Sequence, residues 1–197
     1  MSRLRDRLVA RPPHPPPYVL EDMAIAHPRR LVRLFGIDWM ATPTAGIGPL
    51  WMAVAGIVVA LMSESQSGVG GRVLIGLAYG ALIWASIVVH YLGGAAAGGL
   101  LHAPMRQVIF TATMAYSSYD ESQDYPSRVH VIRGLGEPAA NLLLGAGMLG
   151  VYLAGARSHV VLYLAILNLI FFVTGMAPIP TMHGGIMLRH LKQWKPG

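Results

Sequence analysis

Four long apolar runs constrain the fold of this chain more than any other feature. They cover residues 45–62, 73–101, 138–156 and 160–177. A membrane-spanning helix needs about 20 predominantly apolar residues, and each run reaches or nearly reaches that length. Only 12% of the 197 residues are charged, whereas soluble domains carry about 25%. We therefore predict an all-α membrane protein with about four transmembrane helices.

The apolar runs divide the chain into three parts. Residues 1–44 are expected to form a Pro/Arg-rich arm, because the prolines between 12 and 17 prevent a helix there. Residues 45–190 form the transmembrane domain, and residues 191–197 form a basic tail. Within the domain, residues 108–116 are rich in β-branched and aromatic side chains. This composition predicts a small β-hairpin or strand at the cytoplasmic face.

The basic residues predict an orientation for these helices. Seven arginines lie in residues 1–44, three lie in residues 103–133, and three basic residues follow the last run. The two intervening loops contain one each, Arg72 and Arg157. By the positive-inside rule both termini are cytoplasmic, as in a multi-pass protein of a prokaryotic inner membrane. Basic segments that flank apolar runs indicate an anionic lipid surface, so we expect no nucleic-acid partner.

Three short motifs lie in or beside the runs: VVHYLGG at 88–94, GEPAAN at 136–141 and PIPTMHGG at 178–185. In order and spacing they resemble the motifs of the site-2 protease family of intramembrane zinc metalloproteases. That family has a His-Glu-Leu-Gly-His-Ala type motif, then Gly-Pro-x-x-Asn, then a Pro-x-Pro-x-x-Asp-Gly-Gly type motif. The resemblance covers about residues 35–190, and it implies a site-2-protease-like core.

The resemblance also implies which chemistry has changed. In the family, two histidines four residues apart and an aspartate bind zinc, and a glutamate acts as the general base. His90 matches the first histidine, whereas Tyr91 stands at the glutamate, Gly94 at the second histidine and His183 at the aspartate. Tyrosine, with a pKa of about 10, is a poor base at neutral pH. The resemblance thus implies a degenerate, proteolytically inactive member without catalytic residues.

Other interpretations of the same residues remain open. His90, His183 and Glu137 are candidate ligands for a rearranged metal site, and hence for an active metalloprotease. Glu137 is expected near the cytoplasmic end of its run and His90 about 16 Å deeper, so their meeting requires an in-folded loop. His90 or His183 could instead ligate a tetrapyrrole in an electron-transfer or light-harvesting complex. We expect neither zinc nor tetrapyrrole, and we interpret His90 as a vestigial or packing residue.

The function that these observations favour is that of an accessory or structural subunit of a larger membrane complex. Its expected partners are membrane lipid and other membrane protein subunits. The small residues 93–99 predict a close helix-packing surface, in the pairs Gly93/Ala97 and Gly94/Gly98. The absence of cysteine excludes disulfides, thiolate metal sites and a cysteine nucleophile.

Overall fold

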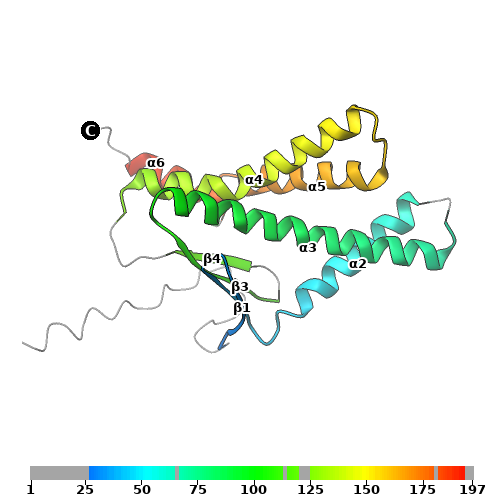
Figure 1. The fold of residues 1–197 in the computed structure, drawn as a ribbon, viewed down its shortest axis with the longest axis horizontal. Coiled ribbons are helices and arrows are strands. Elements are labelled where there is room, and N and C mark those ends of the chain that lie inside the picture. Colours follow the sequence, from blue (N-terminus) through cyan, green and yellow to red (C-terminus); the bar gives the residue numbers. More distant parts are fainter. Residues whose placement is uncertain (1–26, 65–66, 113–114, 120–124, 180–181, 194–197) are drawn as a thin grey trace, which may run out of the picture.

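The structure, a computed structural model, describes residues 27–64, 67–112, 115–119, 125–179 and 182–193. The elements follow in the order β1 (Arg29–Leu34), β2 (Ile37–Ala41), α2 (Ile47–Ser63), α3 (Val69–Leu100), β3 (Met105–Phe110), β4 (Ala115–Tyr119), α4 (Ser127–Leu153), α5 (His159–Gly175) and α6 (His183–Gln193). The helices form an elongated bundle, and the sheet lies beside the C-terminal half of α3 (Figure 1). The proline cluster and the last four residues of the basic tail lie outside the described residues.

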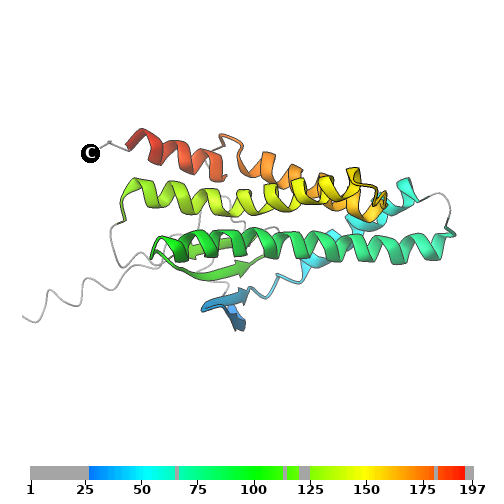
Figure 2. The same cartoon turned by 45° about the horizontal axis from the view of Figure 1, so that its top comes forward.

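Each predicted apolar run coincides with a helix, but four transmembrane helices are not confirmed. In the part of the chain that the structure describes, α3 alone is long and apolar enough to cross a membrane, with a mean hydropathy of 2.0. The helices α2 and α5 are apolar but shorter. The connections α2–α3 and α4–α5 lie at one end of the bundle, and the sheet and α6 lie at the other (Figure 2).

The prediction of an all-α fold with one hairpin is only partly correct, because the sheet has four strands in the order β1-β2-β3-β4. The hairpin predicted at residues 108–116 is present as the antiparallel pair β3–β4. The parallel pairing of β2 with β3 requires a crossover, which the helices α2 and α3 supply. Strands β1 and β2 lie within residues 1–44, where we expected only an arm. RRLVRL has no alternation of apolar and polar residues, and all six of its side chains are exposed, so no pattern marked it as a strand.

An apolar core joins the sheet to α3. Its buried members include Trp39 on β2, Val108 and Phe110 on β3, and Tyr91 on α3. The Tyr91 hydroxyl donates a hydrogen bond to the carbonyl oxygen of Ala115 on β4. This core therefore fixes β4 beside the part of α3 that contains the VVHYLGG motif.

The predicted small-residue surface lies within the chain, where α3 and α4 pack backbone to backbone. A Cβ added at Gly93 would collide with the Gly136 carbonyl oxygen and with Ala140, and one at Gly136 would lie 2.5 Å from the Cβ of Ala97. Both helices thus use small residues four positions apart at their contact. This close approach determines how near the side chains of α3 and α4 lie to one another.

We predict that Gly93→Ala destabilises the protein by about 1–3 kcal/mol, because the added methyl overpacks the α3–α4 contact. Gly99→Ala is the matched control on the same helix, since a Cβ there meets nothing within 4 Å. Alanine has the higher helix propensity, so the control is expected to be neutral or to stabilise by up to about 1 kcal/mol. Thermal unfolding in detergent compares the two, and equal stability would contradict the packing.

Candidate metal site

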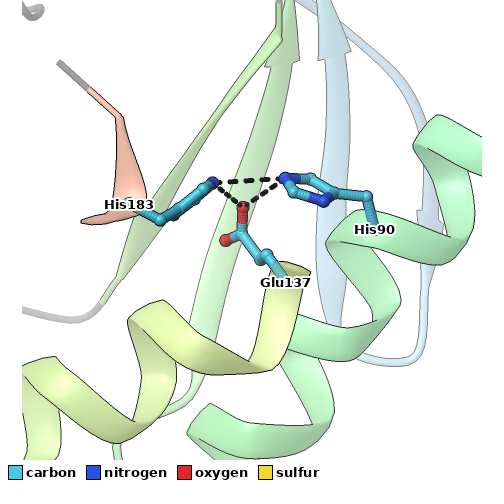
Figure 3. A group of neighbouring side chains, drawn as sticks. All are labelled: His90, Glu137 and His183. Atoms are coloured by element: carbon cyan, nitrogen blue, oxygen red, sulfur yellow. Dashed lines mark hydrogen bonds and ion pairs between the residues drawn. The ribbon is translucent and has the colours of Figure 1, made fainter. Parts of the chain in front are cut away.

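Three ionisable side chains from three helices converge at one point (Figure 3). His90 on α3 and His183 at the start of α6 face each other with their Nε2 atoms 3.2 Å apart. The Oε2 atom of Glu137 on α4 lies 3.3 Å from the His90 Nε2 and 3.2 Å from the His183 Nε2. In the described part of the chain this is the one group of three or more His, Asp or Glu side chains whose ligand atoms converge in this way.

The expectation that Glu137 lies too far from His90 is wrong, and the reason is where α4 begins. We placed the start of that helix at Pro138, but α4 starts at Ser127 and Pro138 lies inside it. Ten residues of helix before Glu137 amount to about 15 Å, which matches the depth of His90 from the end of α3. The two residues therefore meet on neighbouring helices, and no in-folded loop is needed.

Gly94 makes room for the Glu137 side chain. A Cβ added at position 94 would collide with Cγ of Glu137 and would lie 2.6 Å from its Oε1. The position that aligns with the second histidine of the family motif is therefore filled by a carboxylate from the neighbouring helix. The absence of a side chain at Gly94 and the presence of the Glu137 carboxylate thus complement each other within a single space.

His90 is held by a second hydrogen bond on the far side of its ring. Its Nδ1 lies 2.6 Å from Oδ1 of Asn141. The Asn141 amide nitrogen donates to Asn168 Oδ1 at 2.7 Å, so its oxygen faces the histidine. Nδ1 must then carry the hydrogen of a neutral ring, which leaves a lone pair on Nε2 directed at Glu137 and His183.

This network continues through three helices. Asn168 on α5 donates a hydrogen bond to the Ser86 hydroxyl on α3 at 3.0 Å. The side chains of Asn141, Asn168 and Ser86 are all buried. Asn141 was recognisable as the last residue of the GEPAAN motif. Asn168 could have been noticed as an isolated amide in an apolar run, whereas nothing in the sequence singles out Ser86.

The two oxygens of Glu137 have different partners. Oε1 accepts hydrogen bonds from the Ser117 hydroxyl at 2.8 Å and from the Tyr119 hydroxyl at 3.0 Å, both on β4. Burial and the adjacent Glu137 carboxylate raise the pKa of Tyr119, so its hydroxyl stays protonated as a donor. Oε2 is buried, and among the residues that the structure describes it has no hydrogen-bond partner. The Nε2 atoms of His90 and His183 lie 3.2–3.3 Å from it. Sequence analysis missed both hydroxyl donors on β4, Ser117 and Tyr119.

His183 reaches the site where the first turn of α6 packs closely against the residues that follow α5. A Cβ at Gly184 would collide with the carbonyl group of Met176, so the glycine of the PIPTMHGG motif permits this approach. Burial lowers the pKa of His183, an effect that the Glu137 carboxylate partly opposes. The neutral ring, with a lone pair on one nitrogen, is therefore favoured near neutral pH.

These donors fit a metal ion of the zinc class. Atoms bonded to one tetrahedral zinc at about 2.0–2.1 Å lie about 3.3–3.4 Å from one another, and the three donors here are separated by 3.2–3.3 Å. Two histidines and a glutamate are a donor set found in zinc enzymes. A cation would also provide a partner for the buried Oε2 atom. The expectation of no metal thus gains no support from the structure.

The other candidate positions differ from this cluster. Tyr91, at the family's general base, is buried and its hydroxyl is directed to β4, away from the three donors. A tetrapyrrole on His90 or His183 would need a flat space next to the ring nitrogen. The Nε2 atoms of both histidines instead face each other and Glu137, which does not favour such a cofactor.

Comparison with solved structures finds the site-2 protease from Methanocaldococcus jannaschii. The two structures match with a TM-score of 0.60 over 86% of this chain and 74% of that chain, at 19% sequence identity. At this identity the match shows the fold, so the resemblance inferred from the three motifs is confirmed at that level. No protein-family model and no curated protein sequence matches the chain.

Proposed function

We propose that this chain is an integral membrane protein that binds one divalent metal ion of the zinc class at His90, Glu137 and His183. We further propose that it has lost peptide-bond hydrolysis and serves as an accessory subunit of a larger membrane complex. The observation that carries the proposal is the mutual spacing of the three donor atoms, 3.2–3.3 Å.

Membrane insertion is supported by what the helices expose. Only 22% of the most apolar stretch of α3 is buried within the protein, whereas the core helix of a soluble domain is mostly buried. Large apolar side chains are also exposed along α2, α4 and α5, among them Leu50, Val58, Leu143 and Val173. The placement of both short connections at one end and the sheet at the other is compatible with the orientation predicted from the basic residues.

Metal binding is supported by the groups around the donors. Asn141 directs the His90 lone pair into the site, and Ser117 and Tyr119 hold the carboxylate in place. Such outer partners orient ligands in metalloproteins. A zinc ion held by three protein ligands keeps a coordination position open and can act as a Lewis acid.

Loss of hydrolysis is supported by the contacts of the carboxylates that the structure describes, each of which is engaged with other groups. That part of the chain contains three carboxylates, Asp38, Glu64 and Glu137. Asp38 pairs with arginines of β1, and Glu64 contacts Tyr79 and His159 near the α2–α3 and α4–α5 connections. Glu137 belongs to the donor cluster, and the Tyr91 hydroxyl donates a hydrogen bond to β4. Removing a general base reduces a rate by about 10²–10⁴-fold.

The proposed accessory role is supported by a fold and a donor cluster that come without a general base. Three protein ligands leave one coordination position for a donor from outside the chain. A partner's side chain in that position would make the contact with the partner dependent on metal. This arrangement suits a subunit that acts through binding.

We predict that the purified, metal-stripped protein takes up one zinc ion per chain. Alanine at His90, Glu137 or His183 should lower the affinity more than Tyr119→Phe, for which the expected loss is about 10–100-fold. His159→Ala is the control, because His159 pairs with Glu64 and not with the site. Competition with a chelator measures each affinity. A protein that takes up no zinc, or takes it up equally in all variants, would refute the site.

We also predict that the third ligand can be transferred from position 137 on α4 to position 94 on α3. Gly94→His alone should abolish zinc binding, because its side chain collides with Glu137. Gly94→His combined with Glu137→Gly should recover part of the affinity, since a histidine four residues after His90 lies on the same helical face. Of the three atoms nearest to a Cβ at position 94, only the Tyr119 hydroxyl, at 2.8 Å, remains and must shift. The double variant Gly99→His with Glu137→Gly is the control and should not bind zinc. Recovery in the control would show that any added histidine suffices.

Proteolysis is tested separately. We expect the zinc-loaded protein, reconstituted in nanodiscs, to leave transmembrane peptide substrates uncleaved over many hours in an assay by mass spectrometry. Zinc-dependent cleavage that disappears in His90→Ala would overturn the inactive assignment while leaving the metal site intact.

A further inference from the structure

The hairpin of β1 and β2 presents a surface that the rest of the described chain leaves uncovered. All six residues of β1 are exposed, and β1 makes no extensive contact with any described element except β2. Because β2 itself is anchored by Trp39 and Ile37 in the core, the hairpin is held firmly at its inner strand. Its outer strand and turn project from the protein.

The turn of the hairpin is apolar and conformationally unfavourable. Phe35 and Gly36 both have positive φ, 54° and 79°. Such turns favour Asn-Gly, because the short polar side chain of asparagine tolerates positive φ and glycine, without a Cβ, adopts it freely. Phe35 is 83% exposed, and Leu31 and Leu34 beside it are exposed as well. A strained, exposed phenylalanine at the tip indicates that the tip meets an apolar environment.

The same strand is basic. Arg29, Arg30 and Arg33 lie on β1, and the one acidic residue of the hairpin is Asp38. Asp38 Oδ1 is 3.5 Å from Arg30 and 3.8 Å from Arg33, in exposed pairs that hold the side chains only weakly. The hairpin therefore keeps a net positive charge around its apolar tip.

Chain connectivity places the hairpin at the level where α2 begins. Residues 42–46 alone separate β2 from α2, and five residues span at most about 18 Å. Trp51, 66% exposed, and Leu50 lie in the first turns of α2. Exposed tryptophan is typical of the membrane–water interface, so the hairpin lies near that interface if α2 enters the membrane.

We propose that the β1–β2 hairpin docks on the anionic surface of the membrane. The tip, Leu34 and Phe35, enters the boundary between headgroups and acyl chains, and Arg29, Arg30 and Arg33 contact lipid phosphates. Charge and apolar character together favour lipid over a partner protein at this surface. The inference rests on the membrane insertion in the proposed function and is independent of the metal site.

The absence of cysteine allows a direct test by single spin labels. The full chain carrying Phe35→Cys is labelled with a nitroxide and reconstituted in nanodiscs of phosphatidylcholine, with or without phosphatidylglycerol. In anionic discs we expect the label to collide with oxygen several-fold more than with a water-soluble nickel chelate. Combining Phe35→Cys with Arg30→Gln and Arg33→Gln should reduce this ratio in anionic discs and leave it unchanged in neutral ones.

A label at Val58→Cys, an exposed position in the middle of α2, separates the possible failures. If the Val58 label contacts lipid while the Phe35 label collides mainly with the nickel chelate, the hairpin inference is overturned and membrane insertion stands. If the Val58 label is also aqueous, insertion itself is wrong. A Phe35 label that neither probe reaches would show a protein contact at the tip, such as a second copy, and would equally overturn lipid docking.

Discussion

A carboxylate taken out of water must find compensating partners, and in this protein that requirement centres on Glu137. Its side chain is 2% exposed, and an unpaired buried charge would cost several kcal/mol. Its partners come from every element around it: hydroxyls from β4, histidines from α3 and α6. The packing of β4, α3 and α6 around α4 thus depends on their contacts with the Glu137 side chain. A cation at Oε2 would complete the compensation that the hydroxyls begin at Oε1.

The fold brings these elements together by close packing and by a buried polar network. Small residues let α3 and α4 approach until Gly94 and Glu137 share one space. The amides of Asn141 and Asn168 then connect α4 and α5 to α3 and orient the ring of His90. The structural match to a site-2 protease shows that the two proteins share this fold. In this chain the helices bring together His90, Glu137 and His183. Tyr91, at the position where the motif resemblance places the general base, joins α3 to the sheet.

Much of this could be predicted from the sequence, and the failures have physical causes. The runs 45–62 and 160–177 coincide closely with α2 and α5, because hydropathy alone sets their ends. The sequence predicts the start of α4 too late for two reasons. Its first turns are polar, with Arg128 and Arg133, and proline, here Pro138, is common at the first position of a helix. The motifs identified His90 and His183 as candidates. Their contact with Glu137 depends on the register of α3 against α4, which no local pattern contains.

The central claim is that three donors on three helices form one metal site, and anomalous diffraction at the zinc absorption edge tests it most directly. Crystals of the zinc-loaded protein should show a single anomalous peak within bonding distance, about 2.0–2.2 Å, of His90 Nε2, His183 Nε2 and Glu137 Oε2. The peak should be absent from Glu137→Ala crystals grown in the same way. A zinc-loaded crystal without a peak there, or with the peak on other residues, would contradict the account.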